Sequence, residues 1–401
     1  MRDTIAQRRP SASRKPARNG LRPVYTVSIV MPCLNEAATV GNCVRKAFSW
    51  LERAGFAGEV IVVDNGSSDG SPELAKKAGA KVIREARRGY GNAYHTGLAE
   101  AGGDIIVMGD SDDTYDFSQL DSMIEPLLDG HDLVVGNRYE GGIRPGAMTW
   151  SHRYIGTPAI STLLRLSSGL RVGDSQCGMR AFTRKALGKM RLRCGGMEFA
   201  SEMLLEAGRR GLRVAEVPVP YYRRAGEAKL STFRDGWRHL RFLLVNTPRL
   251  AFLAPSLLLI ALGVISLALP VLRPEGLQVG SLTWQPVFAG SILVAVGAQG
   301  LMLGVLSTLY ALSQEVIIRD RLGTFFQEKV RLEHLLILSA LLVLVGLTLD
   351  GVLLVQWLSG SSTATQIGLA AIAQTSIIIG GQWTLSAILY GLLTEGRWRD
   401  A

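Results

Sequence analysis

The chain has 401 residues, of which 47% are hydrophobic, and its formal net charge is +10. Up to about residue 248 its composition is that of a soluble α/β domain, and long apolar runs follow. This pattern excludes a wholly soluble protein and predicts a globular domain joined to a membrane domain. The basic residues gather in the N-terminal tail and beside the apolar runs. They favour an anionic lipid bilayer over nucleic acid as the partner.

The first 26 residues contain seven Lys or Arg together with Pro, Ser and Asn, and they lack an apolar core. This composition predicts a disordered basic tail at 1–26 and excludes a signal peptide. The four cysteines have neither C-x-x-C spacing nor paired histidines, and they are Cys33, Cys43, Cys177 and Cys194. We expect reduced structural cysteines in a cytosolic domain.

Four short apolar runs each end in polar residues, and helical segments separate them at spacings of 20 to 25 residues. This alternation predicts βαβ units and a mostly parallel sheet, in which ligands bind at the carboxyl ends of the strands. The predicted strands are 27–31, 60–63, 81–84 and 105–108. The polar residues that follow them are Asn35 and Glu36, Asp64 and Asp69, Gly89 to Asn92, and Asp110 and Asp112.

The fourth run leads into the acidic sequence DSDD at 110–113. The carboxylates of Asp110 and Asp112 can converge on a hard divalent cation that keeps positions open for substrate phosphates, as Mg²⁺ prefers. A solvated acidic turn is the alternative for an isolated D-x-D. Four polar clusters at one sheet edge favour a nucleotide site, where Asp64 suits ribose hydroxyls or a base edge and the glycine-rich 87–92 suits a phosphate or base.

The segment 229–249 has an amphipathic helical pattern that begins at Lys229. Its apolar residues recur at helical spacing beside a basic stripe, and the two sets are Phe233, Trp237, Leu240 and Leu244, and Arg234, Arg238 and Arg241. Such a helix directly before a membrane segment is expected to lie in the bilayer interface. The alternative is a helix packed on the globular domain with solvated arginines.

Four later runs, 250–272, 287–312, 335–355 and 367–393, are each long enough to span a bilayer. The loop between the second and third is basic, with Arg319, Arg321, Lys329 and Arg331. The positive-inside rule therefore places the globular domain and both termini in the cytoplasm of a multi-pass cell (inner) membrane protein. Small and polar residues of the last run predict close helix packing, within the chain or in a homo-oligomer; they are Gln374, Gly380, Gly381 and Gln382.

Several stretches stand together in a specific order, namely VSIVMPCLNEAATV, VIVVDNGSSDGS, GYGNA, DSD and GNRY. In this order and spacing they resemble the family 2 glycosyltransferases, which implies a GT-A fold. The stretches SHRYIGT, DSQCGMRAF and GEAKLSTFRDGWRHLRFLL resemble the polyprenyl-phosphate sugar transferases of the dolichol-phosphate mannose or glucose synthase type. The resemblance covers about residues 26–245. It implies an α/β, Rossmann-like GT-A domain at 27–228, before the interfacial segment and an all-α, four-helix transmembrane domain at 250–395.

The resemblance implies an inverting hexosyltransferase that moves one sugar from a UDP- or GDP-linked donor to an undecaprenyl- or dolichyl-type polyprenyl phosphate, with Mg²⁺ or Mn²⁺ as cofactor. It assigns the donor nucleotide to Pro32, Asn35, Glu36, Asp64, Asp69, Gly91 and Asn92, and the metal to Asp110 and Asp112. It assigns the acceptor phosphate to Arg138, Arg153 and Thr157. We further expect Gln176 and Glu198, the latter at the start of a predicted helix, to contact the sugar. Glu198 is equally typical of a helix N-terminus, where acidic residues are favoured by the helix dipole.

The chemistry of such a transfer favours arginines. Cleavage of an anomeric C–O bond passes through an oxocarbenium-like state while negative charge builds on the leaving diphosphate. A lipid phosphate is already ionised near neutral pH, so it needs positioning more than a general base. The candidate phosphate ligands are Arg138, Arg144, Arg153 and Arg180.

Thr114 stands where the mannose synthase group commonly has Gln, as D-x-D-x-Q, which leaves the third metal contact open. Two other functions are compatible with the fold. A glycolipid or polysaccharide synthase is disfavoured because the chain has QCGMR at 176–180 and no Q-x-x-R-W motif. A non-catalytic nucleotide-sugar-binding membrane adaptor is disfavoured because Asp110 and Asp112 are both present.

Overall fold

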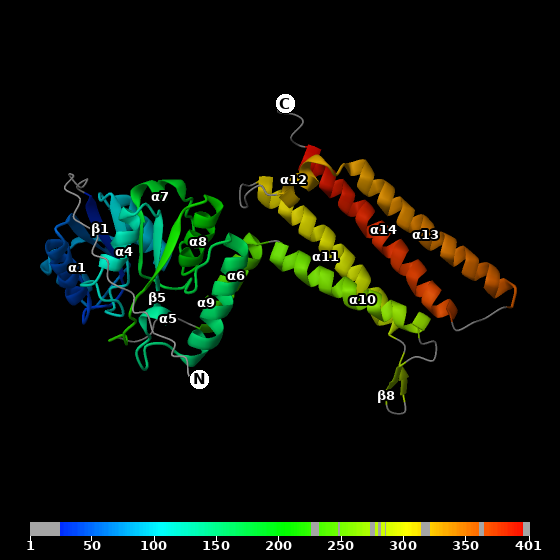
Figure 1. Ribbon diagram of the computed structural model, residues 1–401, viewed down its shortest axis with the longest axis horizontal. Helices are drawn as coiled ribbons and strands as arrows, with labels where there is room; N and C mark the ends of the chain where they lie inside the picture. The colour runs from blue at the N-terminus through cyan, green and yellow to red at the C-terminus, as the bar shows by residue number, and fades with distance from the viewer. Residues whose placement is uncertain are drawn as a thin grey trace, which may run out of the picture.

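The structure is a computed structural model that describes residues 25–225, 232–247, 249–272, 277–279, 282–284, 286–313, 321–360 and 365–395. Most of the predicted tail, Lys229 and the side chain of Arg234 lie outside the described residues. An α/β domain is followed by a domain of long helices (Figure 1). The predicted fold class, a mostly parallel α/β domain before a four-helix transmembrane domain, is confirmed.

A seven-stranded sheet with the order β3-β2-β1-β4-β6-β5-β7 forms the centre of the α/β domain. The strand β6 is antiparallel to both of its neighbours, and the other pairs are parallel, so six strands have their carboxyl ends at one edge. The strands are β1 (Thr26–Cys33), β2 (Ala57–Asp64), β3 (Lys81–Arg84), β4 (Ile105–Met108), β5 (Leu133–Asn137), β6 (Arg180–Thr183) and β7 (Val214–Pro218). The first four confirm the predicted strands, and β5 to β7 were not predicted.

Helices cover both faces of this sheet, so β4 is buried throughout and has no polar face (Figure 1). The helices of this domain are α1 (Val40–Ala54), α2 (Ser71–Lys77), α3 (Tyr90–Glu100), α4 (Asp121–Leu128), α5 (Arg138–Gly141), α6 (Thr157–Ser168), α7 (Arg184–Lys189) and α8 (Phe199–Arg209). A π-helical turn, η1 (His152–Gly156), continues directly into α6.

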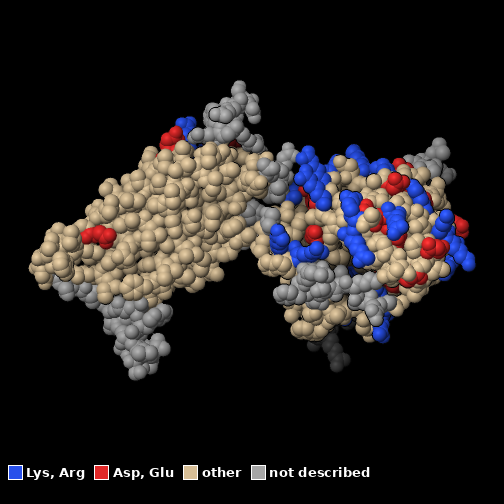
Figure 2. All heavy atoms as spheres, turned by 180° about the vertical axis from the view of Figure 1, so that it is seen from behind, with Lys and Arg blue, Asp and Glu red and all other residues tan. Residues whose placement is uncertain are grey.

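The helix α9 (Thr232–Asn246) connects the α/β domain through the π-helical turn η2 (Arg249–Leu253) to the long helices. These are α10 (Ala254–Leu272), α11 (Val287–Ser313), α13 (Leu332–Leu358) and α14 (Thr365–Glu395). Within the described residues, four segments are long and apolar enough to cross a bilayer, and they are Ala251–Leu269, Val287–Ser313, Leu332–Leu358 and Gln366–Thr394. The four predicted spans are therefore confirmed. On the face shown in Figure 2, charged side chains crowd the α/β domain and are few among the described residues of the helical domain.

The long helices form a layer in which α10 packs on α11, α11 on α14, and α14 on α13 (Figure 1). Two glycines of α11 at seven-residue spacing face α10: a Cβ at Gly290 would lie 2.9 Å from the Gly263 carbonyl, and one at Gly297 would lie 2.9 Å from the Ser256 carbonyl. A third, Gly304, faces η2, where a Cβ would lie 2.6 Å from Leu253 Cδ2. The absent side chains let the two backbones approach closely along this interface.

The predicted packing residues of α14 differ in their surroundings. Gly380 packs within the chain, because a Cβ there would lie 2.7 Å from the Ser339 carbonyl of α13. Gly381 and Gln374 are exposed on the surface of the chain, and Gln382 is half-buried. The close packing predicted within the chain is therefore present at Gly380, while packing between subunits stays a prediction.

Two short elements mark the two ends of the helical domain. The helix α12 (Arg321–Glu328) lies at the end that faces the α/β domain, and the hairpin of β8 (Leu277–Val279) and β9 (Leu282–Trp284) lies at the opposite end (Figure 1). The basic loop and the globular domain thus share one side of the layer. The placement of this side in the cytoplasm stays a prediction.

Candidate active site

The acidic pair lies where β4 ends at the carboxyl edge of the sheet. Asp112 is buried, and its Oδ1 accepts hydrogen bonds from the Thr114 backbone N–H at 3.1 Å and from the Thr114 hydroxyl at 2.5 Å. Asp110 accepts a hydrogen bond from the Tyr90 hydroxyl, and burial together with the charge of Asp112 raises the pKa of Asp110 to about 7. The pair therefore favours a cation beside it at neutral pH. Thr114, at the position where the related group has Gln, orients Asp112.

The other two residues of DSDD point away from this pair. Asp113 adopts a left-handed backbone with a φ of 60° and turns to α1, where its carboxylate accepts from Lys46 at 2.7 Å and from Asn42 at 3.0 Å. The Ser111 hydroxyl donates to the Pro32 carbonyl at 2.7 Å and so joins the ends of β4 and β1. Two carboxylates of the motif thus remain at the sheet edge.

Arg224, which sequence reasoning missed, brings two predicted residues together. It follows β7 at the same edge, forms an ion pair with Glu36, and places its Nη1 3.4 Å from Asp112 Oδ2. Its Nε is buried without a hydrogen-bond partner in the described part of the chain. The signal available in the sequence was a pair of arginines, Arg223 and Arg224, after an apolar run.

The predicted nucleotide residues after β1 and β2 fasten the two loops to each other and to α2. Asn35 Oδ1 accepts from the Ser68 backbone N–H at 2.8 Å, and Asp64 Oδ1 accepts from the Ser67 backbone N–H at 3.0 Å. Asp69 accepts from the Ala37 backbone N–H at 2.9 Å, and also from the backbone and hydroxyl of Ser71. These residues therefore shape the donor side of the edge, and direct nucleotide contacts of their side chains stay a prediction.

The glycine-rich loop packs against a second loop, residues 194–196. A Cβ at Gly91 would lie 2.1 Å from the Cys194 carbonyl, and the Asn92 backbone N–H donates to the Gly195 carbonyl at 3.0 Å. The Asn92 side chain donates to the Arg88 carbonyl at 3.1 Å. Close backbone approach thus explains the glycine without a phosphate.

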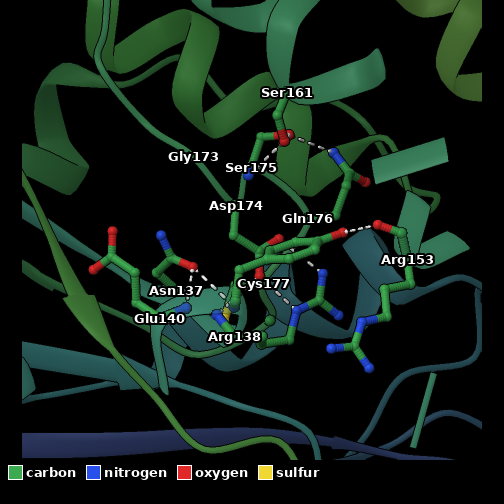
Figure 3. A network of polar contacts seen from close by, with 12 residues as sticks. Asn137, Arg138, Glu140, Arg153, Ser161, Gly173, Asp174, Ser175, Gln176 and Cys177 are labelled. Atoms are coloured by element: carbon green, nitrogen blue, oxygen red, sulfur yellow. Dashed lines mark hydrogen bonds and ion pairs between the residues drawn. The ribbon is translucent and has the colours of Figure 1, made fainter. Parts of the chain in front are cut away.

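Arg138 forms a buried ion pair at the start of α5. Its Nε lies 2.7 Å from Asp174 Oδ2 and its Nη2 lies 2.8 Å from Asp174 Oδ1 (Figure 3). Glu216 Oε1 accepts from the Asp174 backbone N–H at 2.8 Å, and the guanidinium stacks 5.0 Å from the ring centre of Tyr221. Arg138 is therefore held rigidly. Its Nε and Nη2 are paired with Asp174, so these two atoms are not free to bind a phosphate.

The rest of the GNRY sequence ties the site to η1. Asn137 Oδ1 caps α5 by accepting from two backbone N–H groups, and the Tyr139 hydroxyl donates to the Arg153 carbonyl at 2.8 Å (Figure 3). The hydroxyl also hydrogen-bonds Thr157, which is buried. Arg153 is half-buried, and its guanidinium lies 5.4 Å from the ring centre of Tyr154. Arg153 and Thr157 are thus held near Arg138 through Tyr139.

The remaining candidate residues differ in whether their side chains already have partners within the chain. Glu198 Oε2 is buried without a hydrogen-bond partner among the described residues, so it is available to a ligand hydroxyl. Gln176 donates to the hydroxyls of Ser175 and Ser201 at 3.2 and 3.1 Å. Arg144 is exposed and stacks on Tyr222 at 5.7 Å.

Arg180 is fully buried, and the prediction that it binds phosphate is wrong. Its guanidinium donates to three backbone carbonyls, those of Ala200 at 2.6 Å, Ser175 at 2.8 Å and Cys177 at 3.1 Å. Burial lowers its pKa below the ordinary value of an arginine. Arg180 therefore holds the 175–178 loop to α8.

The interfacial candidates of α9 lie on an exposed surface, while the opposite face of the helix packs on the α/β domain. Trp237 is 57% exposed, and Arg238 and Arg241 are exposed as well. Leu243 is buried in the core of the α/β domain, and Asn246 accepts from Arg209 at 3.2 Å. The helix thus packs on the globular domain, as the alternative expected, and the placement of its exposed face in the bilayer interface stays a prediction.

The acidic pair has the oxygen ligands that a hard divalent cation takes. Within the described residues, no group of three or more His, Cys, Asp or Glu side chains is arranged to hold a metal ion. Two carboxylates with open positions match the way Mg²⁺ binds between a protein and substrate phosphates. The residues that would hold the ion are Asp110 and Asp112.

An edge of parallel strands with an acidic pair, in a chain with four helices long enough to span a membrane, is the arrangement expected of a membrane-bound glycosyltransferase of GT-A fold. The chain belongs to glycosyl transferase family 2. The family model of that name matches residues 28–191, and a model of the glycosyltransferase family 2 C-terminal transmembrane region matches residues 305–394.

Its similar proteins include two from Haloferax volcanii. The low-salt glycan biosynthesis hexosyltransferase Agl6 is 38% identical over 376 residues, which cover 92% of this chain and 89% of the relative. A dolichyl-phosphate hexose transferase is 33% identical over 211 residues, 52% of this chain and 89% of the relative. Among solved structures, Mycobacterium tuberculosis glucosyl-3-phosphoglycerate synthase in complex with Mn²⁺, UDP and glucosyl-3-phosphoglycerate is similar at 26% identity and a TM-score of 0.45, covering 55% of this chain and 78% of that one.

Proposed function

We propose that this glycosyltransferase moves one hexose from a UDP- or GDP-linked donor to a polyprenyl phosphate at the cytoplasmic face of the membrane, with Mg²⁺ or Mn²⁺ as cofactor. The observation that carries the proposal is the Asp110 and Asp112 pair, which shares one sheet edge with Glu36 and Arg224. Two Haloferax relatives are named as a hexosyltransferase and a dolichyl-phosphate hexose transferase. The site lies in a domain mounted on membrane spans, beside which a lipid acceptor is available.

The chain's residues divide the work between donor and acceptor. Glu36, Asn35, Asp64 and Asp69 line the donor side, where a bound divalent ion would neutralise the diphosphate. Arg224 is the cation that follows β7, and it can move from the carboxylates to a phosphate as negative charge develops there. Glu198 offers its unpaired Oε2 to sugar hydroxyls.

The acceptor phosphate is expected at η1, where Arg153 is only half-buried. A lipid phosphate oxygen attacks the anomeric carbon, the bond from that carbon to the diphosphate breaks, and the nucleoside diphosphate leaves. The acceptor is already ionised, so no histidine is required as a base. Inversion at the anomeric carbon belongs to this single displacement.

The division of the chain is proposed to follow function, with a basic tail at 1–26, the catalytic domain at 27–228, the interfacial segment at 229–249 and the transmembrane domain at 250–395. The catalytic domain, the basic loop and both termini are placed on the cytoplasmic side by the positive-inside rule.

The test incubates detergent-purified protein with Mg²⁺ or Mn²⁺, undecaprenyl phosphate and radiolabelled UDP- and GDP-sugars, and counts label in the organic phase. We expect label from one donor and its loss with chelator. Asp112→Asn should abolish transfer, whereas the matched control Asp113→Asn should retain it, because Asp113 faces Lys46. Label that persists in Asp112→Asn, or no label from any donor, would contradict the proposal.

A further inference from the structure

The loop before α8 is held by a buried carboxylate of that helix. Glu202 is 7% exposed, and its Oε1 accepts from the Arg193 backbone N–H at 2.9 Å while its Oε2 accepts from the Cys194 backbone N–H at 2.8 Å. An acidic residue in a first helical turn ordinarily faces the free N–H groups of its own helix. Both oxygens of Glu202 instead bind backbone nine and eight positions upstream, so this side chain clamps the loop of residues 193–196.

The clamped loop packs against the glycine-rich loop on the donor side of the sheet edge. The Gly195 carbonyl accepts from the Asn92 backbone N–H at 3.0 Å, and a Cβ at Gly89 would lie 2.2 Å from the same carbonyl. The glycine-rich loop has a second attachment, because the Gly89 backbone N–H donates to Asn65 Oδ1 at 2.7 Å. Release of the 193–196 loop would therefore leave the glycine-rich loop tied through Asn65.

The clamped loop leads directly to Glu198, whose Oε2 is buried without a hydrogen-bond partner in the described part of the chain. A Cβ at Gly196 would lie 2.5 Å from that oxygen, so this glycine leaves the room that the carboxylate occupies. The Glu198 carbonyl accepts from the Glu202 backbone N–H at 2.9 Å. Glu202 thus binds the chain on both sides of the Glu198 side chain, before it through its carboxylate and at it through its backbone.

We propose that Glu202 is a positioning residue, which fixes the place of the Glu198 carboxylate and thereby sets the affinity of the site for the sugar of the donor. The inference rests on the contact between Glu198 and the sugar that belongs to the proposed function. Hydrogen bonds weaken steeply when their distance or angle departs from the optimum, so a carboxylate on a clamped loop binds a sugar hydroxyl better than one on a loose loop. Binding of the nucleotide part depends less on the clamp, because the glycine-rich loop keeps its attachment to Asn65.

The test compares the affinity for a nucleotide sugar with the affinity for its nucleoside diphosphate, by titration calorimetry on the detergent-purified full chain with Mg²⁺. UDP-glucose, UDP-galactose and GDP-mannose are each measured against UDP or GDP. Glu202→Gln keeps the size of the side chain but places an amide N–H group where a carboxylate oxygen accepted. We expect it to weaken binding of the nucleotide sugar about fivefold, as for one lost hydrogen bond, and binding of the nucleoside diphosphate less than about twofold.

Three further variants separate positioning from a general loss of stability. Glu206→Gln is the matched control, because Glu206 is a buried carboxylate of the same helix that accepts from the Arg191 backbone N–H at 3.0 Å, and it should leave the ratio of the two affinities unchanged. Glu202→Asp withdraws the carboxylate by one methylene and should show the same selective loss, which covers the case that Glu202→Gln does not fold. In a Glu198→Ala background, Glu202→Gln should cause no further loss, because the side chain that it positions is gone.

An equal loss for nucleotide sugar and nucleoside diphosphate would overturn the proposal, as would a further fivefold loss in the double variant or the same selective loss in Glu206→Gln. A wild type that binds the nucleotide sugars no more tightly than UDP or GDP would also overturn it. A wild type that binds a nucleotide sugar but transfers nothing to a lipid phosphate would contradict the proposed function alone, because these binding measurements need no transfer.

Discussion

Replacing Asp110 with asparagine is expected to stabilise the metal-free protein while abolishing transfer. The pKa of Asp110 rises from 3.8 to about 7, so the folded protein binds this proton more tightly than the unfolded chain does. Ionisation of this carboxyl therefore lowers the free energy of unfolding. The loss begins as the pH rises through 3.8 and is complete above about pH 7. A pKa change of one corresponds to about 1.4 kcal/mol, so ionisation of Asp110 destabilises the folded protein by at most about 4 kcal/mol at pH 8. Partial exposure of the side chain to solvent reduces this to about 2 kcal/mol.

The assay is thermal unfolding in detergent with chelator at pH 5 and pH 8. At pH 8 we expect Asp110→Asn to raise the midpoint by about 5 °C, and by less at pH 5. Saturating Mg²⁺ should stabilise the wild type and leave the variant unchanged. The control Asp113→Asn loses the partly exposed contact with Lys46, so it should lower the midpoint slightly at both pH values. An Asp110→Asn midpoint at or below that of the wild type at pH 8 would refute the reasoning.

Three further substitutions test individual contacts. Thr114→Val removes the hydroxyl that orients Asp112, at about 1 kcal/mol, so kcat/KM should fall about fivefold and titration should require more Mg²⁺. Gly91→Ala should destabilise the domain by about 1–3 kcal/mol in chemical denaturation because its Cβ meets a backbone carbonyl, whereas Gly188→Ala, which meets nothing, should be neutral or slightly stabilising. Arg153→Ala should raise the KM for the lipid acceptor at least tenfold with the donor KM unchanged, and a change confined to the donor would contradict its placement.

The first half of the sheet could be predicted because each strand is an apolar run that stops at a polar cluster. The residues 105–108, for example, are buried throughout and end at Asp110. Since the carboxyl ends of parallel strands meet at one edge, local patterns were enough to bring Glu36, Asp64 and Asp112 to the same place.

Contacts that depend on sheet order could not be predicted in this way. Arg224 meets Glu36 across 188 positions of sequence, through a strand that lies at the far end of the sheet. The charge of an arginine also does not reveal its surroundings: Arg180 and Arg153 are the same residue type, yet one is sealed against backbone carbonyls and the other is half-exposed. A similar limit applies to Gly91, whose absent side chain makes room for another loop.

The close approach of α10 and α11 at Gly290 and Gly297 is expected to make the two helices move as one rigid pair. Because α10 follows α9 and η2 in the chain, the catalytic domain is connected to this helix pair through helical segments. A change in the tilt of α10 and α11 within the bilayer would therefore change the orientation of the sheet edge relative to the membrane surface. A bulky residue at Gly297 would separate the two helices. It would thereby change the angle at which the active site meets the lipid surface.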